Sequence, residues 1–107
     1  MNYNPNAATL YRITLGGADT NDIGRIVRIL SCNNVHGATI IPATGIWEDT
    51  TESSVVIEIW GLDRSDPIHR TGLVDQIARD LAFAFDQRCV LVSAVDGRAL
   101  LVRNRDR

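Results

Sequence analysis

Lysine is absent from this chain of 107 residues, so all eleven of its basic side chains are arginine. Together with 13 acidic residues they give a net charge of −2, and this balance lacks the basic face that nucleic-acid-binding domains present. We therefore expect no nucleic-acid partner. The arginine bias fits a coding preference, and it also fits guanidinium groups that bind a carboxylate or phosphate through two hydrogen bonds.

Cysteine is also scarce, and the only two, Cys32 and Cys89, lie far apart with no CxxC spacing. This pattern predicts two buried free thiols, no metal site and no cofactor. No apolar run approaches the roughly 18 residues of a membrane span, and residues 1–9 lack the features of a secretory signal. We expect a cytoplasmic protein with no membrane partner.

The remaining composition is that of one ordered domain covering residues 1–107, with 45% hydrophobic residues and enough length for one core. Residues 1–7 and 104–107 are expected to be flexible. Between them, alternating and helical apolar patterns follow each other along the chain. Strands are predicted at 8–16, 38–47, 54–62 and 89–95, helices at 22–32 and 73–85, and a hairpin through Asp96-Gly97 into 98–102.

This order predicts an α+β, ferredoxin-like βαββαβ fold, with two helices on one face of an antiparallel sheet and a short C-terminal hairpin strand. The plan places the strands in the order four, one, three, two. The second strand then lies at an edge, where Pro42 is tolerated because no ladder hydrogen bond is lost. A connector of six residues, "EDTTES", joins this strand to the third.

Alternation along the two central strands places six residues on the uncovered sheet face: Arg12, Thr14, Val56, Glu58, Trp60 and Leu62. Four of them, Arg12, Thr14, Glu58 and Trp60, are the candidate interface residues. This face is half apolar, and soluble monomers seldom expose such a surface. We expect it to be an oligomer interface in which Arg12 and Glu58 form an ion pair and Trp60 is an anchor. The alternative is that the same four residues line a ligand pocket.

A second candidate region is the tip where the second and third strands join. Thr44, Gly45, Trp47 and Glu48 gather there, with a glycine that permits close backbone approach and an indole that offers a flat stacking surface. These features suggest a ligand site. A plain hairpin with a glycine bulge explains the same residues.

No nucleophile, base and orienting group occur together in a recognisable pattern, so we expect no catalytic residues and no enzyme. If the protein were an enzyme after all, the candidate groups would be His36, His69, Asp63 and Glu58. Both histidines would then be the bases that act near neutral pH.

Three segments carry a family resemblance: "HGATIIPATGIW", "SSVVIEIWG" and "CVLVSAVDGRALLVRNRD". Together they resemble the trimeric PII-type signalling proteins and their PII-like relatives. The chain also resembles a group of small bacterial and actinophage proteins that share a G-x-T-(x5)-G-x-W…E-S pattern. That pattern is formed here by Gly37, Thr39, Gly45, Trp47, Glu52 and Ser53.

The PII-like resemblance implies a homo-oligomer, by analogy a trimer, that holds its ligand in clefts between subunits. It places Thr44, Gly45, Trp47 and Glu48 at the cleft, with Arg103 and Arg105 as contacts for an anion. The expected function is therefore non-enzymatic binding of a small anionic or nucleotide-like ligand, in a phage context the sequestration of a host signalling nucleotide. The alternatives are a structural or protein-interaction module, and a small enzyme with its site at a subunit interface.

Overall fold

The protein is described here by a computed structural model that covers residues 6–102 and 104. It contains four strands, two α-helices and two short 3-10 turns. In chain order these are β1 (Asn6–Gly16), η1 (Thr20–Asp22), α1 (Ile23–Cys32), β2 (Thr39–Trp47), β3 (Thr50–Gly61), η2 (Pro67–His69), α2 (Leu73–Ala84) and β4 (Leu91–Ala99).

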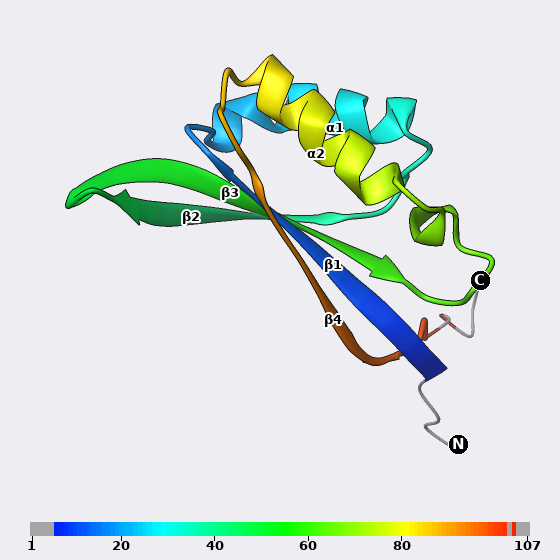
Figure 1. Ribbon diagram of the computed structural model, residues 1–107. Coiled ribbons are helices and arrows are strands. Elements are labelled where there is room, and N and C mark those ends of the chain that lie inside the picture. The colour runs from blue at the N-terminus through cyan, green and yellow to red at the C-terminus, as the bar shows by residue number, and fades with distance from the viewer. Residues whose placement is uncertain (1–5, 103, 105–107) are drawn as a thin grey trace.

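The four strands form one antiparallel sheet in the order β2-β3-β1-β4, and both helices cover the same face (Figure 1). This arrangement confirms the predicted α+β, ferredoxin-like fold and its strand order. β2 is an edge strand, so Pro42 lies where the missing N–H costs no central ladder bond.

The core lies between the sheet and the helices, and it follows from two periodicities. Every second residue of the central strands points toward the helices, and each helix returns an apolar stripe every three or four residues. Side chains that are completely buried come from both layers: Ile13, Leu15, Val55 and Ile57 from the sheet, and Ile26, Ile77 and Leu81 from the helices.

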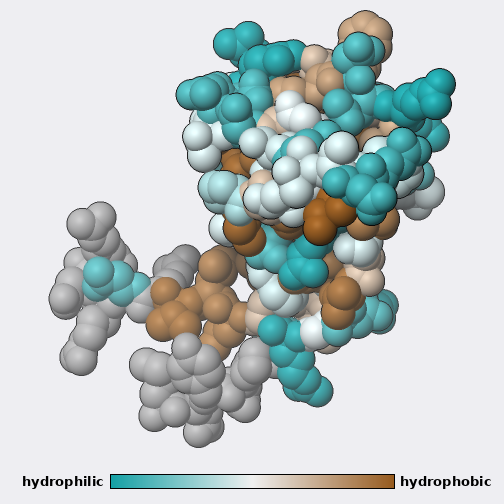
Figure 2. All heavy atoms as spheres, turned by 90° about the vertical axis from the view of Figure 1, so that its left-hand side faces the viewer, coloured by the Kyte–Doolittle hydropathy of each residue, from teal (hydrophilic) through white to brown (hydrophobic). Residues whose placement is uncertain are grey.

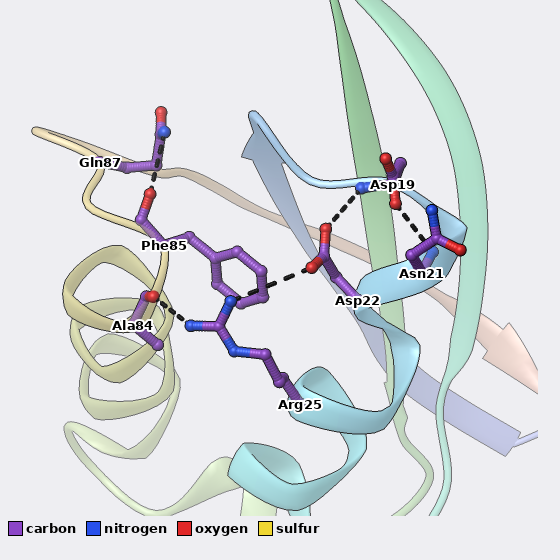
Figure 3. A network of polar contacts seen from close by, with 7 residues as sticks. All are labelled: Asp19, Asn21, Asp22, Arg25, Ala84, Phe85 and Gln87. Atoms are coloured by element: carbon purple, nitrogen blue, oxygen red, sulfur yellow. Dashed lines mark hydrogen bonds and ion pairs between the residues drawn. The ribbon is translucent and has the colours of Figure 1, made fainter.

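The start of the first helical segment is fixed by a capping box. Asp19 accepts a hydrogen bond from the Asn21 backbone N–H at 2.8 Å, and Asp22 accepts one from the Asp19 backbone N–H at 2.9 Å (Figure 3). These bonds satisfy N–H groups that have no partner within the helix.

Arg25 joins the beginning of α1 to the end of α2. Its guanidinium donates to the Ala84 carbonyl, lies 4.0 Å from an Asp22 carboxylate oxygen and sits 4.3 Å above the Phe85 ring centroid (Figure 3). The Ala84 carbonyl is one of the groups left without a helical partner where α2 ends. Arg25 thus links the two helices at this end of the helical layer.

Two predicted connections are wrong. β2 and β3 are joined by Glu48 and Asp49 alone, and both have positive φ (48° and 64°). The expected connector "EDTTES" therefore belongs mostly to β3, and the hairpin is longer than predicted. It projects well beyond the body of the molecule in Figure 1.

The expected hairpin at Asp96-Gly97 does not form either, because β4 runs straight through both residues to Ala99. Both residues pair with β1, opposite Thr9 and Ala8. The strand β1 begins at Asn6, inside the stretch expected to be flexible. The two thiols expected to be buried, Cys32 and Cys89, are exposed.

Candidate functional site

Neighbouring strands of the sheet end at different levels. A large hollow lies where β3 extends beyond its neighbour β2. β2 begins at Thr39, opposite Glu58, whereas β3 continues to Gly61. The last three residues of β3 therefore have no β2 neighbour. The hollow beside this free edge has a volume of about 530 Å³, which is within the usual range of small-molecule sites.

Three parts of the chain that are distant in sequence form the walls. The loop between α1 and β2 supplies one wall, the end of β3 with η2 supplies another, and the segment that follows β4 closes the third. The lining residues include His36, Thr39, Glu58, Trp60, Asp66 and Leu100.

Trp60 is the aromatic side chain of this hollow. It belongs to the uncovered sheet face and is 40% exposed. A Cβ added to Gly97 would lie 3.8 Å from the indole Cη2 atom, so the ring lies beside Gly97 of β4, where that strand has no side chain. An indole in this position is a stacking surface for a flat ring.

Two carboxylates line the hollow, and they differ in how they are used. Asp66 accepts hydrogen bonds from the backbone N–H groups of Ile68 (3.1 Å) and Leu62 (3.4 Å), one to each oxygen, and so caps η2. In Glu58, one oxygen (Oε2) accepts from Arg12 Nη2 at 2.7 Å and Nε at 3.0 Å. The other oxygen, Oε1, has no hydrogen-bond partner among the described residues.

The four candidate interface residues do lie together on the open face. In the β1–β3 register Arg12 is opposite Glu58, and Thr14 and Trp60 follow on the same face at spacings of two. The predicted Arg12–Glu58 ion pair is present within one chain. Glu58 and Trp60 also line the hollow. These two side chains therefore belong both to the predicted interface and to the pocket that was its alternative.

Apolar side chains surround the polar pair on this face. Leu91 and Val95 of β4 are 68% and 55% exposed, and Ile41 of β2 is 39% exposed. Figure 2 views the molecule from the side toward which the β2–β3 hairpin projects, and apolar side chains lie open to solvent there among hydrophilic ones. The surface expected to mediate self-association is therefore uncovered in a single chain.

The other predicted site residues lie elsewhere. Thr44, Gly45, Trp47 and Glu48 occupy the far end of the hairpin, and none of them lines the hollow. Trp47 is 70% exposed. Arg103 and Arg105 lie outside the described residues. The hairpin tip and the hollow are thus separate places, whereas the resemblance to PII-like proteins implied that the tip residues lie at the ligand cleft.

The candidate groups for catalysis are divided between two hollows. His36 and Glu58 line the large one, whereas His69 and Asp63 line a smaller one of about 380 Å³ near the start of β1. The described residues contain no group of three or more His, Cys, Asp or Glu side chains that could hold a metal ion. No helix in the described chain is long and apolar enough to cross a bilayer.

The part of the hollow formed by Leu100 and Leu101 was not predicted from the sequence. A turn was predicted at Asp96-Gly97, and this placed residues 98–102 in a hairpin strand rather than beside β3. The signal that was available is the apolar run "ALLV" after β4, which has to cover something. In the structure it lies along the hollow, with Leu100 still 40% exposed.

No family model matches the chain, and no curated protein matches it. Solved structures do share its fold. A phage SAM lyase in its apo state has 23% identity and a TM-score of 0.70, over 90% of this chain and 86% of that one. The phage SAM lyase in complex with S-methyl-5′-thioadenosine has 19% identity and a TM-score of 0.65, over 86% and 90%.

A PII-like protein, CPII from Thiomonas intermedia K12, bound to ADP, AMP and bicarbonate, has 14% identity and a TM-score of 0.58, over 94% of this chain and 100% of that one. The predicted resemblance to PII-like proteins and to small phage proteins is thus confirmed at the level of fold.

The expectation that the protein is not an enzyme is contradicted. Structures that share its fold over most of the chain include a phage SAM lyase, which is an enzyme. The inference went wrong because it relied on a recognisable set of nucleophile, base and orienting group in the sequence. This fold therefore accommodates both ligand binding and catalysis.

Proposed function

We propose that this protein binds a small adenosine-containing ligand in the hollow beside Trp60, in a homo-oligomer whose subunits meet over the uncovered sheet face. The observation that carries the proposal is the position of the indole. Trp60 lies beside Gly97 of β4 and lines a hollow whose walls include apolar side chains and polar groups. A flat ring stacks on such a surface, and polar neighbours then fix its orientation.

Three ligands bound in the structural neighbours support adenosine as the common part. S-Methyl-5′-thioadenosine and the pair ADP and AMP share a purine and a ribose and differ in what is attached to the ribose. We infer that the purine lies against Trp60, and that the ribose reaches the polar residues Thr39 and Glu58, which face each other across the β2–β3 register.

Self-association supports the same site. The apolar residues of the open face border Trp60 and Glu58, so a second subunit placed on this face would deepen the hollow into a cleft. A trimer fits this arrangement by analogy with PII-type proteins. In a phage, such a cleft would serve to withdraw a host signalling nucleotide.

Isothermal titration calorimetry with S-methyl-5′-thioadenosine, adenosine, AMP and ADP tests the proposal. We expect saturable binding of S-methyl-5′-thioadenosine, and a loss of affinity of roughly 5- to 150-fold in Trp60→Ala because stacking on an aromatic ring contributes about 1–3 kcal/mol. Trp47→Ala is the matched control, since it removes the same side chain from the hairpin tip, and its affinity should be unchanged.

Light scattering on each variant separates loss of assembly from loss of the stacking surface. If none of the four compounds binds to the folded wild-type protein, the proposal is refuted. If Trp47→Ala loses binding and Trp60→Ala retains it, the site is at the hairpin tip instead.

A second candidate function is cleavage of S-adenosylmethionine, and the fold shared with a SAM lyase favours it. The positively charged sulfur makes a neutral thioether a good leaving group. When the bond between sulfur and the amino-acid arm breaks, both electrons stay on sulfur and S-methyl-5′-thioadenosine is released. The arm balances this by closing on its own carboxylate or by losing a proton, so neither an oxidant nor a reductant is required.

Mass spectrometry after incubation with S-adenosylmethionine measures this activity directly. Formation of S-methyl-5′-thioadenosine above the rate of the enzyme-free control supports the lyase. An unchanged rate, with saturable binding of S-methyl-5′-thioadenosine, leaves the protein as a binding module.

A further inference from the structure

The charges around the hollow distinguish between adenosine derivatives. Among its described lining residues the charged side chains are Glu58 and Asp66, both acidic, and no arginine lines it. A phosphate attached to the ribose would therefore approach carboxylates, with no facing cation among the described residues 6–102 and 104. A positive group in the same place would approach groups of opposite sign.

The two carboxylates are not equivalent in this respect. Both oxygens of Asp66 accept backbone hydrogen bonds, to Leu62 and Ile68, so this side chain is committed to capping η2. Glu58 accepts two hydrogen bonds from Arg12, and both go to the single oxygen Oε2. Its other oxygen, Oε1, is the acidic oxygen that remains for a ligand within the described chain.

Arg12 offsets part of the negative charge of Glu58, but the carboxylate still presents a negative potential to the hollow. The side chain of Arg12 is 43% exposed, whereas that of Glu58 is 21% exposed. Arg12 is absent from the lining of the hollow, and Glu58 belongs to it. The carboxylate thus lies between the cation on the open face and the ligand space, and the ligand meets the negative side of the pair.

We propose that Glu58 is the specificity-determining residue of this site and that it selects an adenosine derivative carrying a positive charge next to the ribose, as a sulfonium or an ammonium group, over one carrying a phosphate. This inference rests on the proposed adenosine site and adds the class of ligand that the site prefers. It replaces the anionic ligand expected from the sequence with a cationic one.

The expected selectivity is moderate, because the hollow is open to water. Water that reaches the hollow weakens the attraction between the carboxylate and a ligand cation, so we expect a preference of about tenfold for the cationic ligand. Salt screens the attraction further. The preference should therefore weaken as the salt concentration rises.

The test compares sinefungin with S-adenosylhomocysteine. Both carry the same adenosine and the same amino-acid end, but sinefungin has a protonated amine where S-adenosylhomocysteine has a neutral sulfur. Sinefungin lacks the sulfonium leaving group, so turnover cannot distort the measurement. Calorimetry on the full-length wild-type protein should give about tenfold tighter binding of sinefungin, and AMP should bind more weakly than either.

Two variants assign the preference to Glu58. Glu58→Gln keeps the size of the side chain and an oxygen that can accept a hydrogen bond from the ribose, and it removes the charge. Any change in the ribose contact should alter the affinities for sinefungin, S-adenosylhomocysteine and S-methyl-5′-thioadenosine by the same factor, so sinefungin and S-adenosylhomocysteine should bind equally to this variant. Glu52→Gln is the matched control, because it removes a carboxylate from the hairpin, outside the hollow. It should keep the wild-type preference.

The outcomes separate this inference from the proposed function. If S-methyl-5′-thioadenosine binds, but sinefungin and S-adenosylhomocysteine bind equally to the wild-type protein, charge selection is refuted and the adenosine site stands. The same holds if Glu58→Gln keeps the wild-type preference in a protein with unchanged thermal unfolding and oligomeric state. If no adenosine compound binds, the proposed function itself fails.

Discussion

The hydroxyl of Tyr11 lies 2.9 Å from Nδ1 of His69, and this hydrogen bond joins the central strand β1 to the turn η2. The two rings are tilted by 59° with their centroids 5.7 Å apart. Gly61 lies beside the imidazole, and a Cβ added there would come within 2.5 Å of its Nε2 atom. The position of His69 therefore depends on a glycine at residue 61.

Gly61→Ala should consequently destabilise the protein. The new methyl group forces the imidazole to move and breaks its bond to Tyr11, and overpacking of this kind costs about 1–3 kcal/mol. Urea unfolding measures the change. Gly24→Ala is the control, because a Cβ at Gly24 in α1 meets open space, and a helical alanine should stabilise by about 0.5–1 kcal/mol.

Self-association through the open face can be tested with residues that have no role inside the monomer. Val95→Glu places a charge on this face, so light scattering should report a smaller oligomer with unchanged secondary structure. The control is Phe83→Glu, because Phe83 of α2 is 91% exposed in the helical layer, away from the proposed interface. If Val95→Glu assembles like the wild-type protein, this face is not the interface.

The carboxyl group of Asp63 provides a pH-dependent prediction. Hydrogen bonds from the Ser65 hydroxyl and backbone N–H stabilise its charged form and hold its pKa below the ordinary 3.8. The stability it contributes is thus present above the unfolded pKa and is lost as the pH falls through the lower folded pKa. NMR titration should find this pKa below 3.8 in the wild-type protein and closer to 3.8 in Ser65→Ala.

The elements of the fold could be predicted because their signals are local. The stripe from Ile23 to Leu30 and the alternation from Tyr11 to Leu15 each specify one element and its buried face. The strand order then followed from the βαββαβ plan. The pairing of Arg12 with Glu58 was predictable for the same reason, since it needs only two strand phases and their adjacency.

The hollow could not be predicted, because it depends on where neighbouring strands stop relative to each other. Nothing local places Leu100 beside the end of β3, and the Asp96-Gly97 signal pointed to a turn instead. Pairing between β1 and β4 overrides that turn signal, because Asp96 and Gly97 both continue the hydrogen-bonded ladder. Trp60 was assigned to the correct face, but its contact with Gly97 joins residues 37 positions apart.

The turn at Glu48 and Asp49 gives the sharpest test of the hairpin. Both residues adopt positive φ, as in the two-residue turns that favour Asn-Gly, and left-handed backbone costs about 1–2 kcal/mol for an ordinary residue. Replacing Glu48-Asp49 with Asn-Gly should therefore raise the free energy of unfolding by about 1 kcal/mol. The reversed control, Ala-Ala, should lower it.

The hydrogen bond from the Thr50 hydroxyl to the Trp47 carbonyl, at 2.7 Å, closes the same turn, so Thr50→Val should also destabilise the hairpin. A flexible connector of six residues, as the sequence suggested, would tolerate all of these changes with little effect, because its backbone is not restricted to positive φ. Equal stability of the Asn-Gly and Ala-Ala variants would thus contradict the tight turn and the long projecting hairpin together. A clear difference between them would support the two-residue turn, which sets the β2–β3 register and with it the position at which β2 begins and leaves the edge of β3 open.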